Sequence, residues 1–244
     1  WKQGYACIFW GFLLFCFIVT KFFYPIDFLY RYDALLLLAL GFQIALLALK
    51  LEQWREVMVI GIFHMVALCM EIFKTLPSIA SWSYPEPFLL GILNVPLFVG
   101  FMYSAVGSYL ARVWRIFDFR FVNYPNISWS VALAVGIYAN FFTHHFIADV
   151  RYFLVLWVLF LFWRTRIYFT PRKTPYSMNL VLWFCLVAIF IWFAENIATA
   201  MNVWIYPNQS ITWVFVSPQK ILAWFLLVIL SFVLVSLIHK PKSI

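Results

Sequence analysis

Two acidic residues stand at the ends of long apolar runs, and each is followed by the same kind of aromatic turn. Glu71 precedes the turn Trp82-Ser83-Tyr84-Pro85, and Glu195 precedes Trp204-Ile205-Tyr206-Pro207. A carboxylate within an apolar segment is costly, so such residues usually have a partner and often mark a pathway for protons, ions or substrate. We therefore expect Glu71 and Glu195 to be acid–base groups, either in catalysis or in proton exchange.

A third polar group ends another apolar run. His144, His145 and Asp149 are residue types that ligate divalent metals or relay protons, so His144 and Asp149 are catalytic candidates and all three are candidate metal ligands. Adjacent helical residues point about 100° apart, so both histidines reach one ion only with distortion. A divalent metal is the candidate cofactor, its identity left open, and His64 is a weaker candidate as a haem ligand. The alternative is that the charged groups pair with one another and only fix helix register.

Polar and aromatic side chains near the acids are candidates for substrate contact. They are Lys74, Trp82, Tyr84, Arg151, Asn196, Asn202, Trp204 and Tyr206. Residues three, four or seven apart share one face of a helix. This spacing predicts that His64, Glu71 and Lys74 line one face of their helix. It also predicts that Glu195, Thr199 and Asn202 line one face of theirs.

The composition indicates which kind of secondary structure carries these residues. Of the 244 residues, 66% are hydrophobic and 11% are charged, which excludes a water-soluble surface. A helix needs about 20 apolar residues to cross a bilayer. Eight runs approach this length: residues 5–23, 33–49, 57–75, 88–111, 128–148, 151–169, 178–201 and 218–238. We predict an all-α polytopic membrane protein with about eight transmembrane helices in a single transmembrane domain, 1–244, whose first run is a retained span.

The basic residues predict the orientation of these helices. With the N-terminus in the cytoplasm, 12 of the 17 lysines and arginines lie in segments on the inner side. Basic residues favour the cytoplasmic side, so both termini are expected there. They are scattered between apolar runs, so the net charge of +8 does not predict nucleic-acid binding. Most of the acids lie toward the outer side, where we expect the polar site.

Landmarks recur along the chain at a nearly constant offset. Arg31-Tyr32 recurs as Arg151-Tyr152 at an offset of 120 residues, and Glu71 matches Glu195 at 124. The two Trp-x-Tyr-Pro turns are 122 residues apart. These offsets predict a tandem, parallel 4+4 helix repeat, with pseudo-repeats of approximately 1–122 and 123–244. Glu71 and Glu195 should then face each other across a pseudo-twofold axis normal to the membrane.

Several longer strings resemble a known family. They are Glu71-Ile72-Phe73-Lys74, Ser81-Trp82-Ser83-Tyr84-Pro85-Glu86, Asn140-Phe141-Phe142-Thr143-His144-His145-Phe146 and Ala194-Glu195-Asn196-Ile197-Ala198-Thr199. Together they are similar to the YoaT-like bacterial integral membrane proteins, domain of unknown function 817, over essentially the whole chain. The resemblance implies a multi-pass protein of the bacterial inner (plasma) membrane and implies no activity. A fainter similarity to integral membrane carotenoid enzymes is an analogy only.

Two functions fit these residues. The first is a membrane-embedded enzyme that acts on a lipid or isoprenoid at an outward-facing acidic and histidine site. The second is a small proton-coupled transporter, or a lipid- or ion-binding membrane protein, in which the same carboxylates exchange protons. The expected partners are membrane lipids and an isoprenoid or other hydrophobic ligand, and the oligomeric state is left open.

Overall fold

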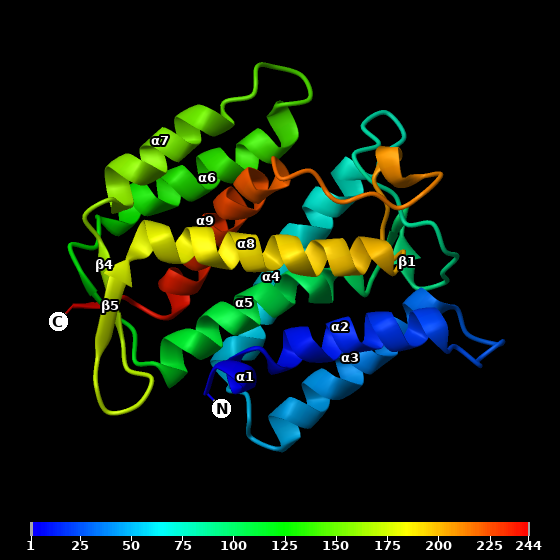
Figure 1. Ribbon diagram of the computed structural model, residues 1–244, viewed down its shortest axis with the longest axis horizontal. Coiled ribbons are helices and arrows are strands. Elements are labelled where there is room, and N and C mark those ends of the chain that lie inside the picture. Colours follow the sequence, from blue (N-terminus) through cyan, green and yellow to red (C-terminus); the bar gives the residue numbers. More distant parts are fainter. Residues whose placement is uncertain (1, 244) are drawn as a thin grey trace. The chain divides into compact units, whose positions relative to one another are not determined.

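A computed structural model describes residues 2–243, and most of them are helical (Figure 1). The α-helices within this part of the chain are α1 (Lys2–Ala6), α2 (Ile8–Phe22), α3 (Arg31–Ala48), α4 (Trp54–Lys74), α5 (Val99–Ile116), α6 (Ile127–Thr143), α7 (Arg151–Phe162), α8 (Leu180–Ala200) and α9 (Lys220–Ile238). Helices α2 to α9 overlap the eight predicted runs in order, with two corrections: the run 88–111 is helical only from Val99, and the run 151–169 only to Phe162. Of these, α3, α4, α8 and α9 are long and apolar enough to cross a membrane, and α2, α6 and α7 are shorter apolar helices. The helical class and its apolar character indicate a membrane protein, as predicted.

Short strands correct the expectation that all structure is helical. A hairpin joins β1 (Gly91–Ile92) to β2 (Val95–Pro96). A second sheet has the order β5-β4-β3-β6, formed by β3 (Arg120–Val122), β4 (Arg166–Phe169), β5 (Tyr176–Asn179) and β6 (Lys242–Ser243). Its β3–β6 pair is parallel, and the other pairs are antiparallel. The strands are two to four residues long, which is too short for an alternating pattern to be recognised among apolar runs.

The chain divides into two compact units. Unit 1 comprises Trp1–Ala6, Leu110–Trp192 and Ser217–Ile244, and unit 2 comprises Cys7–Tyr109 and Phe193–Val216. Helices α5 and α8 therefore each begin in one unit and end in the other. These units differ from the predicted halves 1–122 and 123–244, and the repeat stays a prediction.

In unit 2, small residues of α5 allow it to lie close against α4. A Cβ atom added to Gly100 would lie 2.2 Å from Nδ1 of His64, and one added to Gly107 would lie 2.8 Å from the Phe63 ring. Between them, Ser104 Oγ donates to the carbonyl oxygen of Ile60 at 2.9 Å. Small residues three and four positions apart let helix backbones approach in membrane proteins, so Gly100, Ser104 and Gly107 serve packing.

Unit 1 is built around aromatic side chains. Trp114 of α5 lies 5.0 Å from Phe121 of β3 and 5.2 Å from Phe232 of α9, measured between ring centroids. Phe184 of α8 lies 5.1 Å from Phe232 and 5.7 Å from Phe162 of α7. These contacts place many of the chain's aromatic rings in its interior and attach the small sheet to the helices.

Candidate functional site

Glu71 lies in the last turn of α4 and is only 1% exposed. Its Oε2 accepts hydrogen bonds from the Trp82 indole at 2.8 Å and from the Tyr84 hydroxyl at 2.7 Å. Its Oε1 accepts one from the Tyr103 hydroxyl of α5 at 2.6 Å. Both carboxylate oxygens are therefore bound, and the aromatic turn after α4 is folded back onto the acid that precedes it. Such a shell is what an ionised carboxylate needs when it leaves water.

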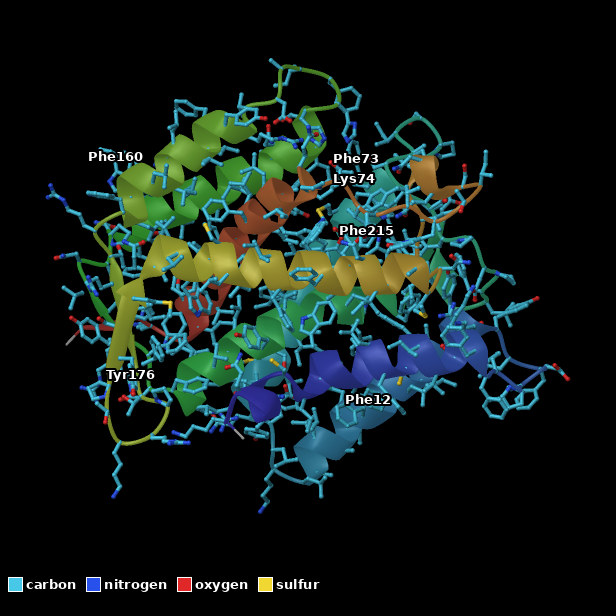
Figure 2. The ribbon with its side chains drawn as sticks, viewed as in Figure 1. Phe12, Phe73, Lys74, Phe160, Tyr176 and Phe215 are labelled. Atoms are coloured by element: carbon cyan, nitrogen blue, oxygen red, sulfur yellow. The ribbon has the colours of Figure 1, made fainter. Side chains whose placement is uncertain are left out.

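Lys74, the last residue of α4, is buried three residues after Glu71, and its charge acts on that carboxylate. Figure 2 labels it at the end of the helix. Glu71 and Lys74 are therefore two buried groups of opposite charge near the end of α4. A nearby cation lowers the cost of burying the acid.

Glu195 on α8 repeats this arrangement. It is 2% exposed, and its Oε1 accepts a hydrogen bond of 2.6 Å from the hydroxyl of Tyr206, which also interacts with the Trp204 side chain. Burial first, and then the charge of Glu195, raise the pKa of Tyr206 well above its ordinary value. Burial and Glu71 do the same to the pKa of Tyr84. Both hydroxyls therefore keep their protons at neutral pH and act as donors.

The two aromatic turns are joined through their central residues. Ser83 N–H donates to Ile205 O and Ile205 N–H donates to Ser83 O, each at 2.9 Å, which forms an isolated antiparallel bridge. The ring of Trp82 meets the ring of Tyr206 edge to face at 6.3 Å. The charge of Glu71 also acts on Tyr206. The structure thus brings both acids and both turns together, and we call this group the paired-turn site.

Three consecutive residues at the start of α3 hold the paired-turn site in place. Arg31 forms an ion pair of 2.6 Å with Glu86, directly after the first turn. The Tyr32 hydroxyl donates to Val203 O at 3.0 Å, directly before the second turn. The Asp33 carboxylate accepts hydrogen bonds of 2.9 and 2.8 Å from two backbone N–H groups that follow Glu86. A single helix end therefore fixes both turns.

The two asparagines predicted to contact substrate have structural partners. Asn202 adopts a left-handed backbone with φ of 54°, and Val203 N–H donates to Ala198 O at 3.0 Å. This is the usual way in which a helix ends at a residue that tolerates positive φ. Asn196 Oδ1 accepts a hydrogen bond of 2.9 Å from Val216 N–H. Contact with substrate stays a prediction for both.

The second predicted cluster lies in unit 1, on the loop between α6 and α7. Asp149 pairs with Arg151 Nε at 2.5 Å and accepts from the Asn140 amide at 3.2 Å. His144 Nδ1 donates to Asn140 O at 2.6 Å, and the rings of His144 and His145 lie 4.1 Å apart. Among residues 2–243, no three His, Cys, Asp or Glu residues are grouped so that they could hold a metal ion. The structure therefore does not assemble His144, His145 and Asp149 as ligands.

Two further residues complete the comparison with the sequence. His64 packs against Gly100 and meets the ring of Phe101 at 5.2 Å, so its surroundings are a helix contact. Tyr103, a donor to Glu71, was not among the predicted site residues. Its signal was a hydroxyl within an apolar run, because a buried hydroxyl requires a partner, but Ser104, Ser108 and Tyr109 of the same run carry this signal too.

Comparison with known proteins adds a family and no activity. The family model described as "Protein of unknown function (DUF817)" matches residues 1–232. The protein named "Uncharacterized protein YoaT" of Bacillus subtilis (strain 168) is 41% identical over 243 residues, covering 100% of this chain and 91% of that protein. No solved structure matches the chain.

Proposed function

Since the chain belongs to the DUF817 family of unknown function, we propose from the paired-turn site that it is a small proton-coupled transporter of the bacterial inner membrane. One observation carries the proposal: two buried carboxylates, Glu71 and Glu195, are joined through paired turns that supply their aromatic donors. Burial disfavours the charged form of a carboxyl group, so two buried acids of this kind can each take up and release a proton. Intramembrane carboxylates with this property are the groups that couple proton movement to transport.

The burial of the two acids favours proton exchange over action on a lipid. Glu71 and Glu195 are 1% and 2% exposed, so protein atoms cover them from both water and lipid. An acid–base group must touch the substrate on which it acts. A proton, in contrast, can reach Glu195 through the hydroxyl of Tyr206, which already donates to it.

The small sheet of unit 1 supports the predicted topology. Strand β3 pairs with β4, and α6 and α7 lie between these two strands in the sequence. Strand β3 also pairs with β6, and α6 to α9 lie between those two in the sequence. Segments that share a sheet lie on one side of a membrane, so an even number of crossings separates them. Lys2 Nζ also donates to Thr170 O at 3.3 Å, which adds the N-terminal segment to this side. Eight crossings with both termini on the side of the sheet satisfy all these contacts, and the basic residues favour the cytoplasm as that side.

The order of the helices supports the 4+4 repeat. Helix α3 begins at Arg31 and α7 at Arg151, an offset of 120, while α5 begins at Val99 and α9 at Lys220, an offset of 121. The bridged residues Ser83 and Ile205 are 122 apart. An antiparallel bridge between equivalent residues has local twofold symmetry, as a parallel repeat requires. Transporters often place their site where two such repeats meet.

Protonation can be tested before any solute is known. A lipid-soluble carbodiimide modifies protonated carboxyl groups, and mass spectrometry locates the label. Because protein atoms cover both acids, the reagent reaches them only during local opening of the structure. We therefore expect slow labelling at Glu195 or Glu71 that falls as pH rises, and its loss at that position in Glu195→Gln or Glu71→Gln. Glu86→Gln is the matched control, because Glu86 is partly exposed and paired with Arg31. Labelling at the two acids that does not change with pH would contradict the proposal.

Transport itself requires reconstitution. Proteoliposomes with a pH-sensitive dye in the lumen would be exposed to a panel of solutes under an imposed proton gradient. We expect solute-dependent proton movement that Glu195→Gln abolishes while expression and folding are retained. Absence of any such movement across the panel would argue against coupling.

The enzyme hypothesis retains one supporting observation. Exposed apolar side chains at Ile211 and Phe215 lie in the segment that is bonded to α8 beside Glu195, where a lipid could approach from the side. Its test is the lipid and isoprenoid profile of a deletion strain complemented with the wild-type protein or with Glu195→Gln. Identical profiles would count against an enzyme acting on these substrates.

A further inference from the structure

The four-stranded sheet of unit 1 has one buried face and one polar face. Residues directly opposite each other on paired strands point to the same side of a sheet. Phe121 of β3 lies opposite Ile167 of β4, and both side chains are buried. Side chains alternate along a strand, so the neighbours of these two residues point to the other face, which we call the basic face. It carries Arg120, Val122, Arg166, Tyr168, Ser177, Asn179 and Lys242.

The three cations of the basic face share one acidic residue. Arg120 lies opposite Lys242, and Asp118 pairs with both, at 2.9 Å to Arg120 and 3.9 Å to Lys242. Arg166 donates to Ser177 Oγ at 3.0 Å, and within residues 2–243 it forms no ion pair with a carboxylate. Like charges that face each other on neighbouring strands destabilise a sheet. The basic face therefore carries a surplus of positive charge that a bound anion would stabilise.

The rest of unit 1 adds to this positive charge. Unit 1 contains 12 of the 17 lysines and arginines and only 2 of the 9 acidic residues. Its second acid, Asp149, lies in the loop between α6 and α7, whereas the sheet adjoins the opposite ends of these helices. Further exposed basic residues lie next to the strands: Arg164, Arg172, Lys173 and Lys240.

Two helices that are long and apolar enough to cross a membrane adjoin the sheet. Helix α8 begins at Leu180, directly after β5 ends at Asn179, and Figure 1 shows β5 leading into it. Helix α9 ends at Ile238, shortly before β6 begins at Lys242. Residues that directly follow or precede a membrane-spanning helix lie at the depth of the lipid headgroups. Charges at this depth are close enough to anionic headgroups to attract them.

The basic face also borders the exposed side of α7. Exposed apolar side chains follow this helix at three- and four-residue spacing and form one stripe. The stripe consists of Phe153, Leu156, Phe160, which is labelled in Figure 2, and Trp163. An exposed tryptophan at the end of an apolar helix is typical of the boundary between hydrocarbon and headgroups. Asn179 of the basic face donates to the carbonyl oxygen of Trp163 at 2.7 Å, and Arg166 lies opposite Asn179.

We propose that the basic face binds the phosphate groups of anionic phospholipids in the adjacent membrane leaflet. Arginine binds phosphate through two parallel hydrogen bonds, so Arg166 and Arg120 are the principal contacts and Lys242 adds a point charge. The stripe of α7 favours a lipid over a soluble anion, because acyl chains can lie against it beside Arg166. This binding site is separate from the two buried acids and does not depend on their uptake of protons.

The test compares two triple variants with the same change in net charge. Phosphatidylglycerol or zwitterionic phosphatidylcholine is titrated into the purified protein in a mild detergent, and native mass spectrometry counts the bound lipids. The first variant removes the cations of the basic face: Arg120→Gln, Arg166→Gln and Lys242→Gln. The matched control removes three exposed cations of unit 2: Lys21→Gln, Lys50→Gln and Arg55→Gln.

The expected effect follows from the number of charges removed. A basic residue near a membrane surface contributes about fivefold to the affinity for anionic lipid, equivalent to about 1 kcal/mol. We expect the wild-type protein to prefer phosphatidylglycerol and the first variant to lose about a hundredfold of that affinity. The control should lose less than about tenfold, because its cations are not part of the basic face. Thermal unfolding checks that each variant is folded.

Three results would overturn the proposal. They are equal losses in the two triple variants, no preference of the wild-type protein for phosphatidylglycerol, and binding of glycerol phosphate as tight as that of the lipid. The last result would identify a soluble anion as the ligand, since glycerol phosphate has no acyl chains. If the first triple variant does not fold, Arg166→Gln is compared with Arg55→Gln. We then expect about a fivefold loss at Arg166 alone, which Arg166→Lys largely restores, and equal affinities would overturn the proposal.

Discussion

Replacement of Tyr103 by phenylalanine should destabilise the protein by an amount that depends on pH. The substitution removes the hydroxyl that donates to Glu71 Oε1 at 2.6 Å and leaves the ring in place. A hydrogen bond to a charged group contributes about 1.5–3 kcal/mol, and one to a neutral group about 0.5–1.5 kcal/mol. Trp82 and Tyr84 still donate to Glu71, so the variant should fold. We expect a loss near the upper range where Glu71 is ionised and near the lower range where it is protonated.

The assay is the free energy of unfolding in mixed micelles of a mild detergent and SDS, followed by tryptophan fluorescence over a series of pH values. Tyr152→Phe is the matched control, because it removes the same atom from a side chain that is 73% exposed. An exposed substitution of this kind should change stability by less than about 0.5 kcal/mol at every pH. If Tyr103→Phe behaves like Tyr152→Phe, the hydrogen bond does not stabilise the fold. If its effect is large and constant with pH, Glu71 does not change its protonation state in that range.

Other substitutions address the remaining features. Gly100→Ala should cost about 1–3 kcal/mol in unfolding free energy, because its Cβ would lie 2.2 Å from the His64 ring, and His64→Ala in the same chain should recover part of the loss. Asn202→Gly should retain stability, whereas Asn202→Val should lose about 1–2 kcal/mol at its left-handed backbone; thermal unfolding of both separates backbone strain from loss of the amide. The pKa of Tyr206 is raised by folding, so its contribution is fully present below the unfolded pKa of about 10 and is lost as pH rises above it. Tyr206→Phe should therefore flatten the alkaline decline in melting temperature, and an unchanged decline would contradict this assignment.

Helices α2 to α9 could be located from the sequence because each overlaps an apolar run, although only α3, α4, α8 and α9 are long and apolar enough to cross a membrane. The recurring Arg-Tyr pairs indicate where two helices begin: α3 begins at Arg31 and α7 begins at Arg151. The strands could not be predicted, because β3 and β6 have three and two residues and pair across α6 to α9. Their register depends on contacts between distant segments, which no local pattern encodes.

The sequence pointed to both acidic residues of the candidate site, but only to some of the side chains that donate hydrogen bonds to them. The recurring turns pointed to Glu71 and Glu195 together with Tyr84 and Tyr206, and the structure groups these residues. Tyr103 was missed because it comes from another helix, and its partner is set by the packing of α5 on α4. The position of Asn202 beside the acids favours a substrate contact, although an asparagine at the end of a helix is also typical of a left-handed helix terminus.

The bridge between Ser83 and Ile205 determines when the site can form during synthesis. Its two halves are 122 residues apart, so α5, α6, α7 and α8 must all be made before the turns can pair. Contacts this distant form late, because much of the chain must be ordered first. Glu71 can obtain Trp82, Tyr84 and Tyr103 early, whereas Tyr206 reaches Glu195 only after α8 is complete. In a nascent chain Glu71 can therefore have its hydrogen-bond donors while Glu195 still lacks Tyr206. The two acids can form one site only when the protein is nearly complete.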